Sequence, residues 1–267
     1  MKQRTGIIAS LCVALLASTA PSLCARAGNA DESSTLLQRV QSNVEKFVDD
    51  FGLMRYQENV EQQKLRDNEK VAYQQEFVFD SIMRMRYDEG KLKADEQRIM
   101  ERTPRHVEAR PLVSTYGFST LAMVFHPYYA DDFRFSQLAM DSSQDAGLTR
   151  IHFEHIAGKP TPVLYQMIGA DKPLELSGDA WVDAASGDIH RIQMTLKITV
   201  DDPGIKAIRA ELSYSPVTLE DETAPRFLPA TATIDVETAR QHWRNIHKFQ
   251  DYRKYRVSIN MSGATTQ

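Results

Sequence analysis

A strict two-residue alternation of apolar and polar side chains constrains this chain more than any other feature. From Arg191 to Val200, apolar residues at even positions alternate with polar residues at odd positions. The same period runs through 71–88 and 208–215. Such alternation gives a strand one face for the core and one for water, which is typical of antiparallel sheets. Weaker strand candidates cover 54–64, 92–101, 132–141, 148–157, 162–168, 174–183, 227–238 and 243–260.

Turn signals separate these runs. Asp88-Glu89-Gly90 and 183–188 have the composition of hairpin loops, and Asp202-Pro203-Gly204 that of a further turn. Roughly ten strands in series predict a large meandering sheet, and a twisted sheet of that size curls or closes. We therefore expect an α+β fold in which a curved antiparallel sheet forms an open half-barrel.

Two segments are predicted to be helical. In 36–51, apolar residues recur at three- and four-residue spacing, Ser33 or Ser34 is available as the N-cap, and Gly52 stands where a helix end favours a left-handed residue. Residues 112–126 are apolar on most of their circumference, and Pro127 ends them. A helix of that kind is normally enclosed. The concave side of the sheet is the expected place.

Residues 1–27 have the pattern of a cleaved secretory signal peptide. A basic start and an apolar run from Gly6 to Ala17 precede Ala25-Arg26-Ala27, an A-x-A pattern that makes Gly28 the first mature residue. Cleavage after Ala30 fits almost as well. The apolar run is shorter than the about 20 residues that a bilayer-spanning helix needs. The sequence therefore predicts a periplasmic or secreted protein.

Removal of this segment changes the composition of the chain. Cys12 and Cys24 both lie within it, so mature 28–267 has no cysteine and no means of forming a disulfide. The mature chain has 29 basic against 36 acidic side chains, a net charge of −7, which disfavours nucleic acid as a partner. No second apolar segment approaches membrane-spanning length. We expect 28–267 to fold as a single domain on its core alone.

One hairpin points to a family. Gly178, Trp181, Val182 and Asp183 form a G-x-x-W-V-D strand that leads through a turn to the I-x-R-I strand at 189–192. With the export signal, the amphipathic first helix and the long strands in meander order, this pattern resembles the periplasmic lipoprotein-carrier superfamily, which includes outer-membrane lipoprotein-sorting proteins. The resemblance implies a half-barrel with a helical lid and an apolar hollow that receives the acyl chains of a lipoprotein or lipid.

The inner face of such a sheet supplies candidate ligand contacts. The side chains expected to line the hollow are Phe77, Phe79, Met83, Met85, Phe118, Leu121, Phe125, Met194, Leu196 and Tyr214. Methionine suits adaptable apolar binding surfaces. The same side chains could instead fill an ordinary core against the two helices. The sequence leaves both alternatives open, so the second functional hypothesis is a solid-core interaction or scaffold domain of the cell envelope.

Motifs for catalysis or metal binding are missing from the sequence. His152 and His155 lie three apart on a predicted strand, hence on opposite faces, and His242 and His247 lie five apart with the same result. The mature sequence has no zinc spacing, no G-x-S-x-G elbow and no phosphate loop. A hydrolase or metal enzyme would need a buried polar cluster that the sequence does not display. We therefore expect a non-enzymatic protein without cofactor or metal.

Residues 240–256 mix basic and aromatic side chains in an acidic protein. The candidate docking residues for an anionic headgroup or an envelope protein are Arg244, Lys248, Arg253, Lys254 and Arg256. The structural alternative is a long strand with a basic solvent face and with Trp243, Phe249, Tyr255, Val257 and Ile259 turned inward. We favour the strand.

Overall fold

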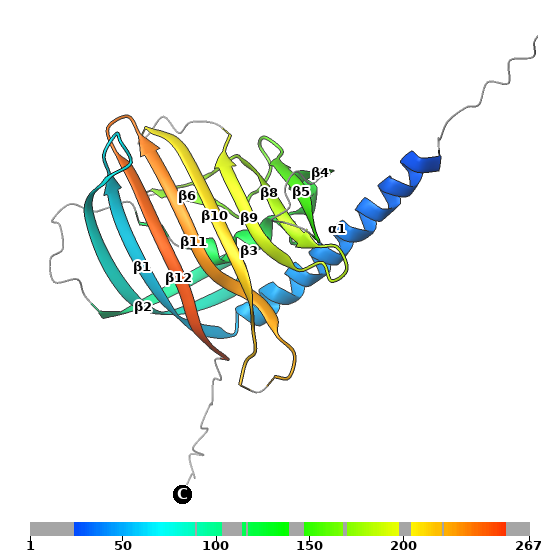
Figure 1. Ribbon diagram of the computed structural model, residues 1–267, viewed down its shortest axis with the longest axis horizontal. Helices are drawn as coiled ribbons and strands as arrows, with labels where there is room; N and C mark the ends of the chain where they lie inside the picture. The colour runs from blue at the N-terminus through cyan, green and yellow to red at the C-terminus, as the bar shows by residue number, and fades with distance from the viewer. Residues whose placement is uncertain are drawn as a thin grey trace, which may run out of the picture.

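The protein folds around one large antiparallel sheet (Figure 1). The computed structural model describes residues 24–88, 90–102, 114–115, 117–138, 147–167, 170–197, 204–220 and 222–254. Ten strands pair in the order β3-β2-β1-β12-β11-β10-β9-β8-β5-β4. Their bounds are β1 Met54–Leu65, β2 Val71–Asp88, β3 Lys91–Arg102, β4 Phe133–Leu138, β5 Leu148–His155, β8 Leu176–Asp183, β9 Ile189–Leu196, β10 Ile205–Val217, β11 Arg226–Thr238 and β12 His242–Lys254.

The predicted curved antiparallel sheet is confirmed, and its pairing order refines the predicted meander. β3 and β4 are its two edges, so the described strands do not close into a barrel. Most neighbours are consecutive in the chain, but β1 pairs with β12 in the middle of the sheet. A short hairpin, β6 Leu164–Met167 and β7 Ala170–Pro173, forms a separate two-stranded sheet between β5 and β8 in the chain. The sequence did not predict β7, since four residues give too short an alternation.

The first helix, α1, spans Cys24–Phe51 and runs diagonally beneath the sheet in Figure 1. The predicted apolar stripe is confirmed, because Leu36, Val40, Val44, Val48 and Phe51 are all buried in the core. The predicted N-cap is wrong. The helix continues upstream of Ser33 and Ser34, so neither residue caps it.

The helix ends beside Gly52, as predicted, but Gly52 is not left-handed. A Cβ added to Gly52 would lie 3.2 Å from the Cβ of Met85 on β2. Glycine therefore leaves room for the close approach of helix and strand, which a Cβ would crowd.

The apolar segment on the concave side is a 3-10 helix, η1, over Phe118–Phe125, followed by a short second one, η2, over Ala130–Asp132. The predicted helix over 112–126 is therefore confirmed for Phe118–Phe125, as a 3-10 helix, but its predicted start is wrong, with 112, 113 and 116 outside the described residues. Gly117 begins the segment at φ 74°, and Thr120 kinks it, with its hydroxyl donating to the Gly117 carbonyl at 2.7 Å.

The predicted end and enclosure of this segment are confirmed. His126, the residue before Pro127, is extended with ψ 138°, as the steric demand of proline requires. Every side chain from Ser119 to Phe125 is buried.

The concave face of the sheet has an apolar half and a polar half. Over β9, β10 and β11 the buried side chains are aliphatic, among them Ile192, Leu212 and Ile234. Over β1 and β12 the same face carries buried Glu58, Gln62, Asn245 and His247. Among the helices of the described residues, none has the length and hydropathy to span a membrane.

Candidate ligand-binding cleft

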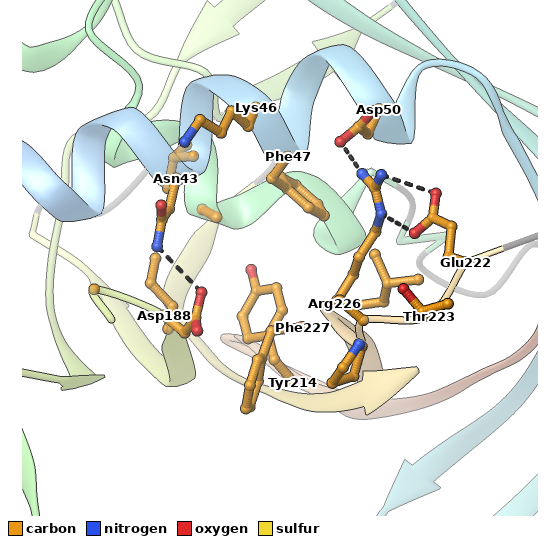
Figure 2. A pocket seen from close by; sticks show the side chains of 17 residues that line it. Asn43, Lys46, Phe47, Asp50, Asp188, Tyr214, Glu222, Thr223, Arg226 and Phe227 are labelled. Atoms are coloured by element: carbon orange, nitrogen blue, oxygen red, sulfur yellow. Dashed lines mark hydrogen bonds and ion pairs between the residues drawn. The ribbon is translucent and has the colours of Figure 1, made fainter. Parts of the chain in front are cut away.

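An open cleft of about 850 Å³ lies between α1 and the ends of β9, β10 and β11 (Figure 2). One wall is the α1 segment from Asn43 to Asp50. The other walls are the β8–β9 turn at 187–188, the β10–β11 loop at 222–225 and the start of β11. The cleft therefore forms where the apolar half of the concave face passes under the helix.

The floor of the cleft is aromatic and aliphatic. Phe47 on α1 points toward Tyr214 and Phe227, which come from β10 and β11 (Figure 2). The rings of Phe47 and Tyr214 meet edge to face with 6.3 Å between centroids, a geometry that favours aromatic contact beyond burial alone. Tyr214 is buried, and that desolvation raises the pKa of its phenol far above the ordinary value. Tyr214 therefore stays neutral and offers the cleft an apolar ring.

Charged side chains close one end of the cleft. Arg226 on β11 pairs with Asp50 on α1, and its guanidinium donates to Glu222 in the β10–β11 loop at 2.5 and 2.8 Å. The Lys254 ammonium lies 2.5 Å from the other side of the same Glu222 carboxylate. The hydrogen bonds from Arg226 and Lys254 lower the pKa of Glu222 to about 2. This ion-pair network, Asp50–Arg226–Glu222–Lys254, ties the end of α1 to the sheet.

At the other end of the cleft, α1 meets the β8–β9 turn. The Asn43 amide donates to the Ser186 carbonyl at 2.9 Å and to the Asp188 carboxylate at 3.1 Å. Gly187 has φ 80°, and a Cβ there would lie 2.9 Å from the Cβ of Arg39. Only glycine satisfies both the left-handed backbone and the approach to the helix. α1 is thus held on both sides of the cleft by polar contacts.

Only one of the ten predicted lining residues, Tyr214, lines this cleft. Met83, Leu121, Phe125 and Met194 are buried in the core, and Met85, Phe118 and Leu196 pack against it. Phe77 and Phe79 are half-buried on β2 and stack on each other at 5.8 Å. Most of the concave face is therefore filled, and a ligand role for these nine residues stays a prediction.

Phe47, Arg226 and Phe227 line the cleft but were not predicted from the sequence as ligand-lining residues. Phe47 was assigned to the core stripe of the first helix, where it stands at the edge of the stripe. Arg226 and Phe227 directly follow Pro225 at a strand start. A charged residue beside an aromatic one after a turn is the sequence pattern that could have indicated a binding site here.

A second constellation is a polar cluster buried inside the sheet, which we call the Glu58–His247 cluster. The Glu58 carboxylate lies 2.6 Å from His247 Nδ1, which must donate because a carboxylate only accepts. His247 Nε2 lies 2.8 Å from the hydroxyl of Thr115. The Ser81 hydroxyl donates to Glu58 at 3.2 Å. Glu58 and His247 are both 0% exposed.

Arg98 on β3 joins the cluster to a second carboxylate. Its guanidinium lies 2.7 and 2.8 Å from Glu58 and 3.0 Å from Glu96. Glu96 also accepts from the Tyr56 hydroxyl and from the backbone N–H of Gly117, each at 2.7 Å. The cluster therefore anchors the segment before η1 to the sheet.

The two carboxyls respond to burial in opposite directions. Burial, followed by the charge of Glu58, raises the pKa of Glu96. Burial also acts to raise the pKa of Glu58, but the His247 hydrogen bond and the Arg98 charge outweigh it and lower that pKa. The structure thus contains a buried polar cluster that the sequence does not display. The sequence concealed the cluster because its members are spread over β1, β3, β12 and the segment before η1.

The basic strand has the predicted orientation in its described part. Trp243 and Phe249 are buried, whereas Tyr255, Arg256, Val257 and Ile259 lie outside the described residues. Arg244 pairs with Asp235 at 2.9 Å, and Lys254 with Glu222, while Lys248 and Arg253 are exposed. A docking role for these cations stays a prediction.

His152 and His155 also have ordinary structural contacts. His155 is buried, and His152 on the opposite face lies 2.8 Å from Asp179, which confirms that the pair does not share a face. No group of three metal-ligating side chains occurs among the residues that the structure describes.

The fold and the site thus define an open antiparallel half-barrel with a cleft beneath its helix. No protein-family model and no curated protein matches the chain. Among solved structures, a LolA superfamily protein, NE2245 from Nitrosomonas europaea, is similar over 85% of this chain and 95% of its own, with 11% identity and a TM-score of 0.36. This match belongs to the superfamily that the sequence pattern resembles. At this identity and TM-score it indicates nothing about a ligand.

Proposed function

We propose that this protein is an exported, non-enzymatic carrier or sensor that binds an acyl chain or a similar apolar ligand in the cleft beneath α1. The observation that carries the proposal is an 850 Å³ cleft with Phe47, Tyr214 and Phe227 on its floor. Small-molecule sites typically measure roughly 300–1,000 Å³ and combine apolar walls with a few polar groups. The Asn43 and Arg226 contacts supply such polar groups at the two ends.

The chemistry of the cleft favours a chain-like apolar ligand. Each methylene removed from water contributes about 0.8 kcal/mol to binding, so a chain of several methylenes on this floor gains enough to offset its ordering. Two cations at the rim, Arg226 and Lys254, are already paired with Asp50 and Glu222, and a third, Lys46, also lines the cleft. Recognition would therefore rest mainly on the apolar part of the ligand, with Lys46 available to an anionic headgroup.

Export is part of the same proposal. The signal-peptide pattern of residues 1–27 supports a function in the periplasm or outside the cell, with 28–267 as a single carrier-like domain. A lipid or a lipoprotein acyl chain is the partner that fits this location. Amino-terminal sequencing of the protein purified from an exporting host tests the cleavage, and an intact first segment would contradict it.

Ligand binding is tested with the purified mature protein. Native mass spectrometry detects co-purified lipid, and titration with a fluorescent fatty acid measures binding. Phe227→Ala should weaken binding of the fluorescent fatty acid at least about threefold, because it removes an aromatic ring from the floor of the cleft. The control Phe77→Ala removes a half-buried ring outside the cleft and should leave the Kd unchanged. Ala224→Trp, at an exposed wall position, should narrow the cleft and also weaken binding. No lipid and no uptake in the parent protein would refute the proposal.

One observation favours a second function, ester hydrolysis. Glu58, His247 and Thr115 form an acid–histidine–hydroxyl series with separations of 2.6 and 2.8 Å, the order of groups that activates a hydroxyl nucleophile. The complete burial of Glu58 and His247 supports the structural role more strongly, because a substrate must reach the hydroxyl. Hydrolysis of nitrophenyl esters that disappears in Thr115→Val, with unchanged thermal stability, would establish the enzyme instead.

A further inference from the structure

The last described strand ends at Lys254, which contacts the cleft residue Glu222, and residues 255–262 follow it in the sequence. We propose that this segment, which we call the tail segment, docks in the cleft of its own chain and competes there with the apolar ligand. The inference rests on the proposed function and names how the same site would be regulated. Four observations support it: where the chain leaves the sheet, how the end of β12 is paired, the sequence of the tail segment, and the distance that the tail segment can span.

The exit point is the first. β12 ends at Lys254, whose ammonium lies 2.5 Å from Glu222. Glu222 is itself a wall residue of the cleft and binds Arg226, another wall residue. The last described residue of β12 is therefore in direct side-chain contact with the wall of the cleft.

The sheet pairing is the second. Lys254 stands opposite Met54, which is the first residue of β1, and the pairing of β12 with β11 has already ended at Lys248. Asp251 has φ 56°, and the β1–β12 register shifts between Arg55 and Gln57 beside it. A bulge of this kind bends its strand. Among the described residues, β12 therefore ends with Met54 as its last partner on one side and with no β11 partner beyond Lys248 on the other.

The sequence of the tail segment is the third. Tyr255, Val257, Ile259 and Met261 alternate with Arg256, Ser258, Asn260 and Ser262. An extended segment with this alternation has one apolar face and one polar face. The apolar face matches the floor of Phe47, Tyr214 and Phe227, which belongs to the same cleft as Glu222, the partner of Lys254.

The reach is the fourth. Eight extended residues span at most about 26–29 Å. A segment of this reach extends well beyond the side chain of Glu222, in a cleft whose lining runs from the β10–β11 loop to the β8–β9 turn. A short linker also gives a high effective concentration, in the millimolar range. Weak contacts are therefore sufficient to fill the cleft when ligand is scarce.

Disulfide trapping tests the position of the tail segment without any ligand. The mature chain has no cysteine, so Ile259→Cys combined with Ala224→Cys in the cleft wall gives one defined pair. The matched control combines Ile259→Cys with Glu211→Cys, an exposed residue on the outer face of β10. Docking predicts rapid cross-linking with Ala224→Cys and slow cross-linking with Glu211→Cys. Equal rates, or no cross-link with Ala224→Cys, would overturn the proposal.

Competition is tested by ending the chain after Lys254. A segment that occupies the cleft in nine of ten molecules raises the apparent Kd of a ligand about tenfold. The shortened protein should therefore bind a fluorescent fatty acid about tenfold more tightly than the full chain, and saturating fatty acid should suppress the cross-link. Equal affinity with and without the tail segment would overturn the competition.

The two proposals fail in different ways. If the cross-link forms but neither protein takes up the fatty acid, the ligand proposal fails and the docking stands. If both proteins take up the fatty acid equally and no cross-link forms, the docking fails and the ligand proposal stands.

Discussion

Replacing Arg98 with methionine removes a guanidinium that faces both Glu58 and Glu96. In the parent protein these carboxylates lie 2.7–3.0 Å from its nitrogens, and Glu58 is 0% exposed while the Arg98 side chain is 16% exposed. Breaking a buried pair by removing one partner costs about 3–5 kcal/mol, because the remaining charge stays in a low dielectric. Arg98→Met leaves two such charges, and His247 is the other group that can compensate Glu58. We therefore expect a loss at the upper end of that range.

The matched control is Arg209→Met. Arg209 pairs with Glu237 at 2.9 Å on the outer face, with 55% of its side chain exposed, and such pairs contribute about 0–1 kcal/mol. For a domain of this size, 1 kcal/mol shifts Tm by roughly 2–4 °C. Arg98→Met should therefore lower Tm by roughly 10–20 °C, and Arg209→Met by less than about 4 °C.

The assay is urea unfolding of the mature protein, followed by tryptophan fluorescence, with thermal unfolding in parallel. Adding Glu58→Gln and Glu96→Gln to Arg98→Met should recover part of the loss, because the unpaired charges are removed. Equal losses for Arg98→Met and Arg209→Met would show that the cluster is solvated, and the reasoning from burial would then be refuted.

Three further predictions follow from the same geometry. Because the folded-state pKa of Glu96 is raised, the parent protein loses stability as pH rises from about 4.3 through that pKa. Glu96→Gln lacks this loss, so its free energy of unfolding should increase relative to that of the parent as pH rises; a difference that does not change with pH would contradict the shift. Gly178→Ala should cost about 1–3 kcal/mol or more, since its Cβ would lie 2.0 Å from the Gln193 carbonyl oxygen, whereas Ser177→Ala should change urea stability little; equal effects would argue against this clash. Arg226→Gln should speed hydrogen exchange in the last turns of α1 and change global stability by under about 1 kcal/mol, because the ion pairs are partly exposed; unchanged exchange would mean that the pairs do not hold the helix.

The sheet could be predicted from the sequence because its signal is local and repeated. Each alternating run, such as 208–215, records which face of its strand meets the core, and ten such runs require one large sheet. The pairing of β1 with β12 could not be predicted, since alternation says nothing about which strands are neighbours. That η1 is a 3-10 helix could not be predicted either, because its helix type depends on the backbone angles of Gly117 and Thr120, which the apolar pattern does not reveal.

The candidate site was predicted least well. The lining residues were chosen for their parity on strands, but parity identifies the concave face and not the part of it that the helices leave open. Tyr214 lies under the gap between α1 and the β10–β11 loop, whereas Met83 and Met194 lie under packed side chains. The Glu58–His247 cluster was missed for a related reason, since its members come from segments far apart in the chain.

The central place of β12 also governs how the chain can fold. Glu58 and His247 are 189 residues apart in the sequence yet share a hydrogen bond in adjacent strands. β1, β2 and β3 can pair early, but their open side at β1 waits for the strand that is synthesised last among those described. Closing so long a loop makes folding slow and leaves apolar strand edges unpaired in the meantime. A chain with this topology cannot complete its sheet until β12 has been synthesised, so its partly paired strands remain exposed during most of synthesis.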